Sequence, residues 1–191
     1  MESNSVSLIL LAAGESSRFG DEKLCSNFRG KPLLQWSLDN LKNVGVLNKF
    51  LIIKPGFELN RFDTGSFKIL INDDYRKGIS TSIVRGLCEC AEERTGIVLM
   101  LADMPLVSGE DVEFLLESLL PEDEMVSFAY DGRKGFPTFI AKKLFPELLK
   151  ITGDRGAFQL VKNGQAKIRE IEGSERNVFD IDSPEDRLQI W

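Results

Sequence analysis

Histidine is absent from the 191-residue sequence. Its absence excludes Ser-His-Asp and Cys-His catalysis, the usual zinc hydrolase sites, and iron sites built from two histidines and a carboxylate. Any chemistry that the chain performs must therefore use carboxylates, lysine, arginine, backbone amides or a bound metal ion.

Cysteine is scarce, and long apolar runs are missing. Cys25, Cys88 and Cys90 are too few and too badly spaced for a disulfide framework or a cysteine-rich zinc site, which suits a reducing compartment. We expect Cys88 and Cys90 to be helix packing residues, with a metal or redox role as the alternative. No run reaches the roughly 18 apolar residues that span a bilayer, and the start MESNSVS lacks a secretory pattern. These features predict a soluble cytoplasmic protein that does not bind membranes.

The charge balance is acidic, with a formal net charge of -6 and an estimated pI of 4.9. The averaged field of such a chain repels polyanions, which argues against nonspecific nucleic-acid binding. Any anionic ligand must therefore be bound by a local cluster of cations.

Strand-length apolar runs alternate with segments of helical periodicity, which predicts a single α/β domain over residues 1–191. Residues 6–13 and 96–102 are apolar on both faces, as expected for central parallel strands covered by helices on each side. The pattern indicates three layers around a mostly parallel, twisted sheet, with six predicted strands at 6–13, 49–54, 67–72, 96–103, 124–130 and 166–172.

Helix signals support this alternation. Pro32 precedes an apolar face that ends at Gly45, and Ser108 with Asp111 forms a predicted capping box. Ser183 and Asp186 predict a second box before a C-terminal helix, and residues 56–66 are polar enough to form an exposed connection.

The loop after the first strand combines glycine, hydroxyl and cationic residues between Gly14 and Lys23. Consecutive loop amides can form an anion-binding nest, and Arg18 and Lys23 supply the positive charge that a triphosphate needs. Neither standard nucleotide-binding fingerprint is present. The loop is interpreted as a phosphate-binding segment, with a solvated surface turn as the alternative.

The stretch LAAGESSRFGDEKL resembles the L-A-A-G-x-S-x-R-x-G-x-x-K signature of nucleotidyltransferases related to molybdenum-cofactor cytidylyltransferase. The resemblance implies the Rossmann-like nucleotide-diphospho-sugar transferase fold. It also implies that Arg18 and Lys23 act on the triphosphate, and that the backbone of Leu11, Ala12, Ala13 and Gly14 faces the base and ribose.

Two further stretches resemble elements of this family that contact the nucleotide and its metal. NDDYRKGISTSIVRGL implies nucleotide contacts from Asn72, Gly78, Ser80 and Ser82, with an ordinary capped helix as the alternative. VLMLADMPLVS resembles the family's G-D-M-P segment, with Ala102 in place of the glycine. Asp103 follows an apolar strand there and is a suitable Mg²⁺ ligand, although it could merely cap the turn before Pro105.

The remaining motifs that resemble the family lie toward the C-terminus. VFDIDSPEDRL resembles D-I-D-T-P-E-D, so Asp180 is interpreted as a second metal ligand and Asp182 as a residue that orients the turn. DGRKGFPTFI and TGDRGAFQLV resemble acceptor-side elements, which implies acceptor contacts from Gly135, Pro137 and Asp154, the last alternatively a helix cap. Phe136 stands where relatives active on this cofactor commonly have histidine, so the acceptor's identity stays open.

The implied reaction transfers CMP from CTP to the terminal phosphate of molybdopterin cofactor and releases pyrophosphate, with Mg²⁺ or Mn²⁺ as cofactor and a molybdoenzyme or its chaperone as a further partner. Arg18, Lys23 and Asp103 are the predicted catalytic residues. Cytidine is favoured because guanylyl relatives usually read Leu-Ala-Gly-Gly where this chain reads Leu-Ala-Ala-Gly. The alternatives are GTP as donor, another phosphorylated acceptor, a nucleotide- or cofactor-binding chaperone without turnover, and a hydrolase on the same fold.

Overall fold

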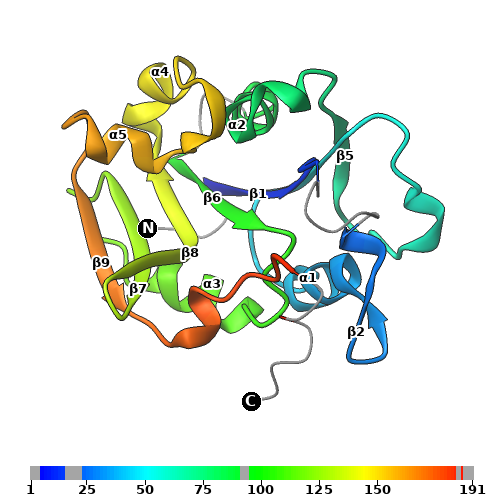
Figure 1. Cartoon of the computed structure of the whole chain (residues 1–191). Coiled ribbons are helices and arrows are strands. Elements are labelled where there is room, and N and C mark those ends of the chain that lie inside the picture. Colours follow the sequence, from blue (N-terminus) through cyan, green and yellow to red (C-terminus); the bar gives the residue numbers. More distant parts are fainter. Residues whose placement is uncertain (1–4, 16–22, 91–94, 184–185, 187–191) are drawn as a thin grey trace.

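The computed structural model describes residues 5–15, 23–90, 95–183 and 186. Its centre is a seven-stranded sheet in the order β5-β4-β1-β6-β8-β7-β9 (Figure 1). The strands are β1 (Val6–Ala12), β4 (Asn48–Ile53), β5 (Lys68–Ile71), β6 (Gly96–Leu101), β7 (Met125–Tyr130), β8 (Arg133–Ala141) and β9 (Ile168–Glu172). A small antiparallel hairpin pairs β2 (Asn27–Phe28) with β3 (Lys31–Pro32).

The sheet is mostly parallel, as the sequence predicts. β1 pairs in parallel with β4 and β6, so the two runs expected to be central are central. β8 is antiparallel to both β6 and β7, and it is a strand that sequence reasoning missed. Ser127 pairs with Thr138 and Ala129 with Lys134, so residues 135–137 face a single residue of β7. Proline is tolerated within a sheet at such a bulge, which explains how Pro137 lies inside a strand.

Helices cover both faces of the sheet (Figure 1). α1 (Leu33–Leu41) and α3 (Gly109–Glu117) lie on one face, and α2 (Ile79–Leu87), α4 (Phe145–Leu148) and α5 (Phe158–Lys162) lie on the other. Short 3-10 turns connect them at Lys23–Cys25, Leu59–Arg61, Tyr75–Lys77, Lys142–Leu144, Gly153–Arg155 and Glu175–Asn177. The architecture is the predicted three-layer α/β fold.

The side chains of β1 show why the sheet needs cover on both faces. Leu8, Leu10 and Ala12 pack with α1 and α3, whereas Ile9 and Leu11 pack with α2 and α5. Because successive residues of a strand point to opposite faces, an entirely apolar strand forms two cores.

The predicted caps are present where the structure describes them. Ser108 and Asp111 form the reciprocal capping box of α3, and Ser183 N–H donates to Asp186 Oδ2 at 2.7 Å. The helix predicted after Ser183 lies largely outside the described residues. Cys88 is exposed at the end of α2, so its assignment as a packing residue was wrong. Within the described ranges, no helix is both long and apolar enough to cross a bilayer.

Candidate active site

A cavity of about 480 Å³ opens at the carboxyl ends of the parallel strands. This is the edge where ligands of open α/β sheets bind, and the volume is typical of small-molecule sites. Nine residues predicted from the sequence line it: Leu11, Ala12, Ala13, Gly14, Lys23, Gly78, Ser82, Asp103 and Asp154. Segments that are distant in sequence therefore meet around one cavity.

Asp103 is placed by the loop that follows β6. Helix α1 holds this loop, because Ser37 Oγ donates to Ala102 O at 3.1 Å and Asn40 Nδ2 donates to Pro105 O at 3.0 Å. The loop also binds the C-terminal segment, since Ile181 N–H donates to the Asp103 carbonyl at 3.1 Å. These contacts fix the backbone of Asp103 from two sides.

Lys23 is the cation that the structure places beside Asp103. Its Nζ lies 2.8 Å from Asp103 Oδ2 and 3.0 Å from Asp182 Oδ1, and the residue is only 7% exposed. Burial opposes the charged ammonium, but the two carboxylates outweigh it, so the pKa of Lys23 is raised above its ordinary value. Lys23 is therefore fully protonated at neutral pH.

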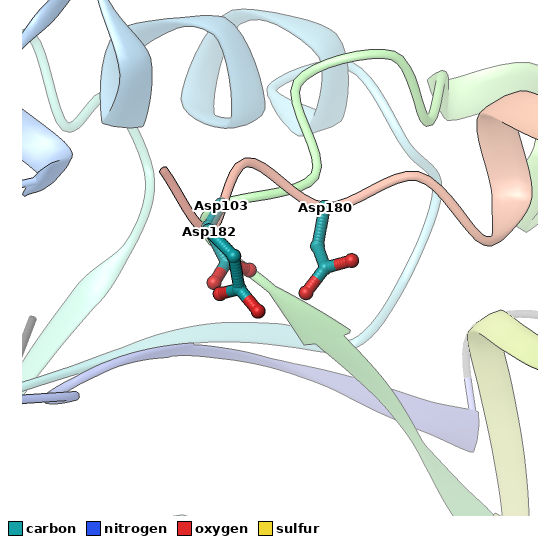
Figure 2. Close-up of side chains that lie close together, drawn as sticks. All are labelled: Asp103, Asp180 and Asp182. Carbon is teal, nitrogen blue, oxygen red and sulfur yellow. The ribbon is translucent and has the colours of Figure 1, made fainter. Parts of the chain in front are cut away.

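Three carboxylates gather at this point, as Figure 2 shows. Oxygen atoms of Asp103, Asp180 and Asp182 all lie within 4.8 Å of one another. Burial raises the pKa of Asp180, and the negative charges of Asp103 and Asp182 raise it further. The cluster thus concentrates negative charge that a cation can neutralise.

The cluster fits a hard divalent cation. Asp103 Oδ1 is buried and accepts no hydrogen bond from the described part of the chain. A buried carboxylate oxygen without a donor is unfavourable, whereas Mg²⁺ and Mn²⁺ prefer such oxygen ligands. Asp103 and Asp180 are thus suitably placed to hold an ion, with Asp182 beside them.

The start of α2 forms another wall of the cavity. Gly78 has a φ of 106°, and a Cβ there would lie 2.4 Å from the carbonyl carbon of Gly153, so no side chain fits. Ser82 lines the cavity and accepts a hydrogen bond from Asn72 Nδ2 at 2.9 Å. Asn72 and Ser80 are buried outside the lining. Asn72 therefore organises this wall, because it also accepts the Asp74 amide at 3.0 Å.

Only one of the three predicted acceptor residues lines the cavity. Asp154 lines the cavity beside Gly78. Gly135 and Pro137 are buried in β8 and do not line it. A Cβ on Gly135 would lie 2.0 Å from Asn177 O, so this glycine allows two backbone segments to pack closely. Arg18, the other predicted cation, lies outside the described residues.

Several lining residues were not singled out from the sequence. Glu15, Tyr75, Arg76 and Ile79 also line the cavity, and Glu15 and Arg76 form an exposed ion pair at 3.4 Å. Asp182, which the sequence predicted only to orient the turn before Ser183, lines the cavity as well. The sequence around Asp182 had a readable signal, because in an extended segment an apolar Ile181 that faces the core leaves Asp180 and Asp182 on the opposite side. The other lining residues carry no distinctive pattern.

Comparison with known families decides the classification. Residues 8–169 match the model of the MobA-like NTP transferase domain. The chain belongs to this family. Asp180 and Asp182 lie beyond the matched range, although they contribute to the same carboxylate cluster as Asp103.

Known relatives of this MobA-like protein have several names. A probable molybdenum cofactor guanylyltransferase from Thermococcus sibiricus is 23% identical over 81% of this chain and 77% of its own. The purine catabolism protein PucB of Bacillus subtilis is 28% identical over 93% of this chain and 92% of its own. The crystal structure of Rv0371c from Mycobacterium tuberculosis in complex with manganese superposes with a TM-score of 0.81 at 24% identity, covering 95% of both chains. The last similarity supports the α/β fold described above.

Proposed function

We propose that this protein transfers a nucleoside monophosphate from a nucleoside triphosphate to the terminal phosphate of a molybdopterin-type cofactor, releasing pyrophosphate. The observation that carries the proposal is the contact between Lys23 and Asp103 at 2.8 Å in the wall of the cavity. It brings the family's phosphate-binding loop next to a carboxylate suited to a metal ion.

The reaction needs no histidine. A phosphate monoester has a second pKa near 6 and is mostly dianionic at neutral pH. Such an acceptor can attack the α-phosphorus without a general base. Catalysis then depends on positioning two anions and on neutralising the charge that develops on the leaving pyrophosphate.

The residues of the chain supply these functions from three directions. Lys23 brings a buried positive charge from the loop after β1. The first turn of α2, entered through Gly78, lines the cavity, and a helix N-terminus there favours phosphate. Asp154 faces the same cavity and could orient an acceptor hydroxyl or amine.

Asp103 and Asp180 are the residues that would hold a divalent ion, and Mg²⁺ or Mn²⁺ fits their oxygen ligands. The manganese complex of the mycobacterial relative supports this assignment. When bound, such an ion would supply Lewis-acid polarisation of the phosphoryl group.

The donor nucleotide is proposed to be CTP, with GTP as the second candidate. Ala13 supports CTP, because its methyl group occupies a position that is usually glycine in the guanylyl relatives, and it lines the cavity. The names of several relatives support GTP, since those from Thermococcus sibiricus and Bacillus licheniformis are called probable molybdenum cofactor guanylyltransferases.

A thermal-shift comparison of CTP, GTP, ATP and UTP with Mg²⁺ would identify the donor. A nucleotide at about 100 times its dissociation constant stabilises the fold by about 2.7 kcal/mol, which is readily measured. The preferred nucleotide should then release pyrophosphate only when the molybdopterin acceptor is added. Binding without any release would favour a chaperone, and release without acceptor would favour a hydrolase.

A further inference from the structure

Lys23 bonds two of the three carboxylates that would surround a metal ion. Its ammonium contacts Asp103 Oδ2 at 2.8 Å and Asp182 Oδ1 at 3.0 Å. A tethered cation therefore neutralises part of the carboxylate cluster. The family signature assigns Lys23 to phosphate, but these contacts give it a second set of partners.

We propose that Lys23 is an internal counter-ion that must leave the carboxylates before a divalent ion binds tightly, so that metal binding depends on the triphosphate. This inference rests on the proposed function, because the triphosphate is the ligand that draws Lys23 away. It adds a role for Asp182, which holds the ammonium in its resting position.

Electrostatics opposes simultaneous occupancy of the cluster by both cations. An ion ligated by Asp103 would lie about 2.0–2.1 Å from a carboxylate oxygen, the usual Mg²⁺ distance. The ammonium on the other oxygen of the same carboxylate would then be a close, partly buried like charge, and water screens such a pair poorly. The ion alone therefore binds weakly while Lys23 stays in place.

A triphosphate removes this obstacle by offering Lys23 new acceptors. The backbone of Lys23 is held, since Ser26 Oγ donates to Lys23 O at 2.6 Å. The four-carbon side chain beyond it is flexible and carries three rotatable donors. The ammonium can thus move from carboxylate to phosphate while the backbone of Lys23 stays in place, and the freed oxygens become available to the metal.

Linkage makes this dependence reciprocal. If the triphosphate increases metal affinity by some factor, the metal increases triphosphate affinity by the same factor. The site would then select the metal–nucleotide complex over either component. Unproductive occupation by a free divalent ion would be suppressed.

The test is a titration of the protein with Mn²⁺ alone, with free Mn²⁺ measured by electron paramagnetic resonance. We compare wild type with Lys23→Gln, which keeps a hydrogen-bond donor but loses the charge, and with Lys23→Met. Both variants should bind Mn²⁺ at least about tenfold more tightly than wild type, a factor within the usual range of coupling between sites.

The matched control is Lys77→Gln. Lys77 is exposed, forms its ion pair with Asp74 at 2.7 Å and does not line the cavity. The Lys77→Gln substitution changes the net charge by the same amount as Lys23→Gln. If Lys77→Gln increased the affinity for Mn²⁺ as much as Lys23→Gln does, the gain would be a general charge effect and the proposal would be overturned. Unchanged affinity in Lys77→Gln supports it.

Equal or weaker Mn²⁺ binding by folded Lys23→Gln would also overturn the proposal, because Lys23 would then support the metal ligands rather than compete with the metal. If neither Lys23 variant folds by circular dichroism, the wild-type titration decides. A dissociation constant below about 1 µM for Mn²⁺ alone would contradict the proposal, and millimolar binding would support it.

This experiment is separable from the test of the proposed function, since it contains no nucleotide and no acceptor. If the Lys23 variants bind Mn²⁺ more tightly but the wild type transfers no nucleotide, only the nucleotidyltransferase proposal is refuted. If the wild type transfers the nucleotide but the Lys23 variants do not bind Mn²⁺ more tightly, only the counter-ion proposal is refuted.

Discussion

The backbone amide of Ile181 donates a 3.1 Å hydrogen bond to the carbonyl oxygen of Asp103. This bond joins the C-terminal segment to the loop after β6, two parts of the chain that are far apart in sequence. It places Asp180 and Asp182 next to Asp103, with Ile181 buried beneath them. The carboxylate cluster thus depends on this backbone contact between two distant segments.

Replacement of Asp103 by Asn, or of Lys23 by Ala, should each reduce turnover at least about tenfold, equivalent to about 1.4 kcal/mol of transition-state stabilisation. Asp103→Asn weakens the metal ligand, and Lys23→Ala removes a cation that stabilises departing pyrophosphate. The measurement is the steady-state rate of pyrophosphate release, with circular dichroism to verify the fold. Lys77→Ala is the control, and wild-type rates in both site variants would eliminate the proposed site.

Substitution of Ala13 by Gly should shift nucleotide preference toward GTP. Ala13 lines the cavity and is only 3% exposed, so loss of its methyl group enlarges the space near the base. We expect the ratio of kcat/KM for GTP to that for CTP to rise about tenfold, the lower end of the discrimination that one methylene provides. Ala12→Gly makes the same chemical change one residue earlier, and a similar shift there would show that backbone flexibility is responsible.

Substitution of Gly78 by Ala should destabilise the protein more than substitution of Gly30 by Ala. Both glycines have positive φ, 106° and 94°, but a Cβ on Gly78 would meet the Gly153 backbone at 2.4 Å whereas one on Gly30 meets nothing within 4 Å. The free energy of unfolding should fall by about 1–3 kcal/mol more in Gly78→Ala, the usual range for overpacking. Urea denaturation measures the difference, and equal losses would mean that the α2 entrance is not tightly packed.

The ion pair between Asp123 and Arg169 should stabilise the fold at neutral pH but not in acid. Arg169 donates to both carboxylate oxygens, at 2.9 and 2.6 Å, and these bonds hold the pKa of Asp123 below its ordinary 3.8. A lowered pKa adds stability above the ordinary value, and this stability disappears as pH falls through the lowered one.

Asp123→Asn should therefore cost about 1–3 kcal/mol at pH 7, as expected for hydrogen bonds to a buried charged group. The difference from wild type should shrink below about pH 4, where the carboxyl of the unfolded chain begins to protonate before that of the folded protein. Thermal unfolding across pH provides the measurement. Glu89→Gln, in the exposed Arg85–Glu89 pair, should have little effect at any pH. A constant difference for Asp123→Asn would exclude the ion pair as its cause.

The local pattern of apolar residues was sufficient to predict six strands and the three layers. Apolar runs of strand length must be buried, and burial on both faces requires helices on both sides of the sheet. The pattern did not predict β8, whose residues Gly135 and Pro137 were assigned to an acceptor-side element by the family resemblance. The bulge that accommodates Pro137 depends on pairing with β7, and pairing between strands is not encoded in either strand alone.

The candidate site could be predicted where a residue's position follows from its neighbours in sequence. Asp103 follows an apolar strand, so its position at the sheet edge could be deduced from its neighbours in sequence. The contact of Lys23 with Asp182 joins residues 159 positions apart, and no local pattern specifies such a pair. Gly135 was assigned to the acceptor from a motif, but the structure shows its close approach to Asn177.

The central claim is tested most directly by following the α-phosphorus of the nucleotide. Purified protein is incubated with Mg²⁺, molybdopterin cofactor and CTP or GTP labelled in the α-phosphate, and the products are separated. We predict that the label appears in a cofactor–nucleotide conjugate, in equal amount with released pyrophosphate, and that Asp103→Asn reduces both at least about tenfold. Label that remains in the triphosphate, or appears as free nucleoside monophosphate whether or not acceptor is present, would contradict the proposed transfer.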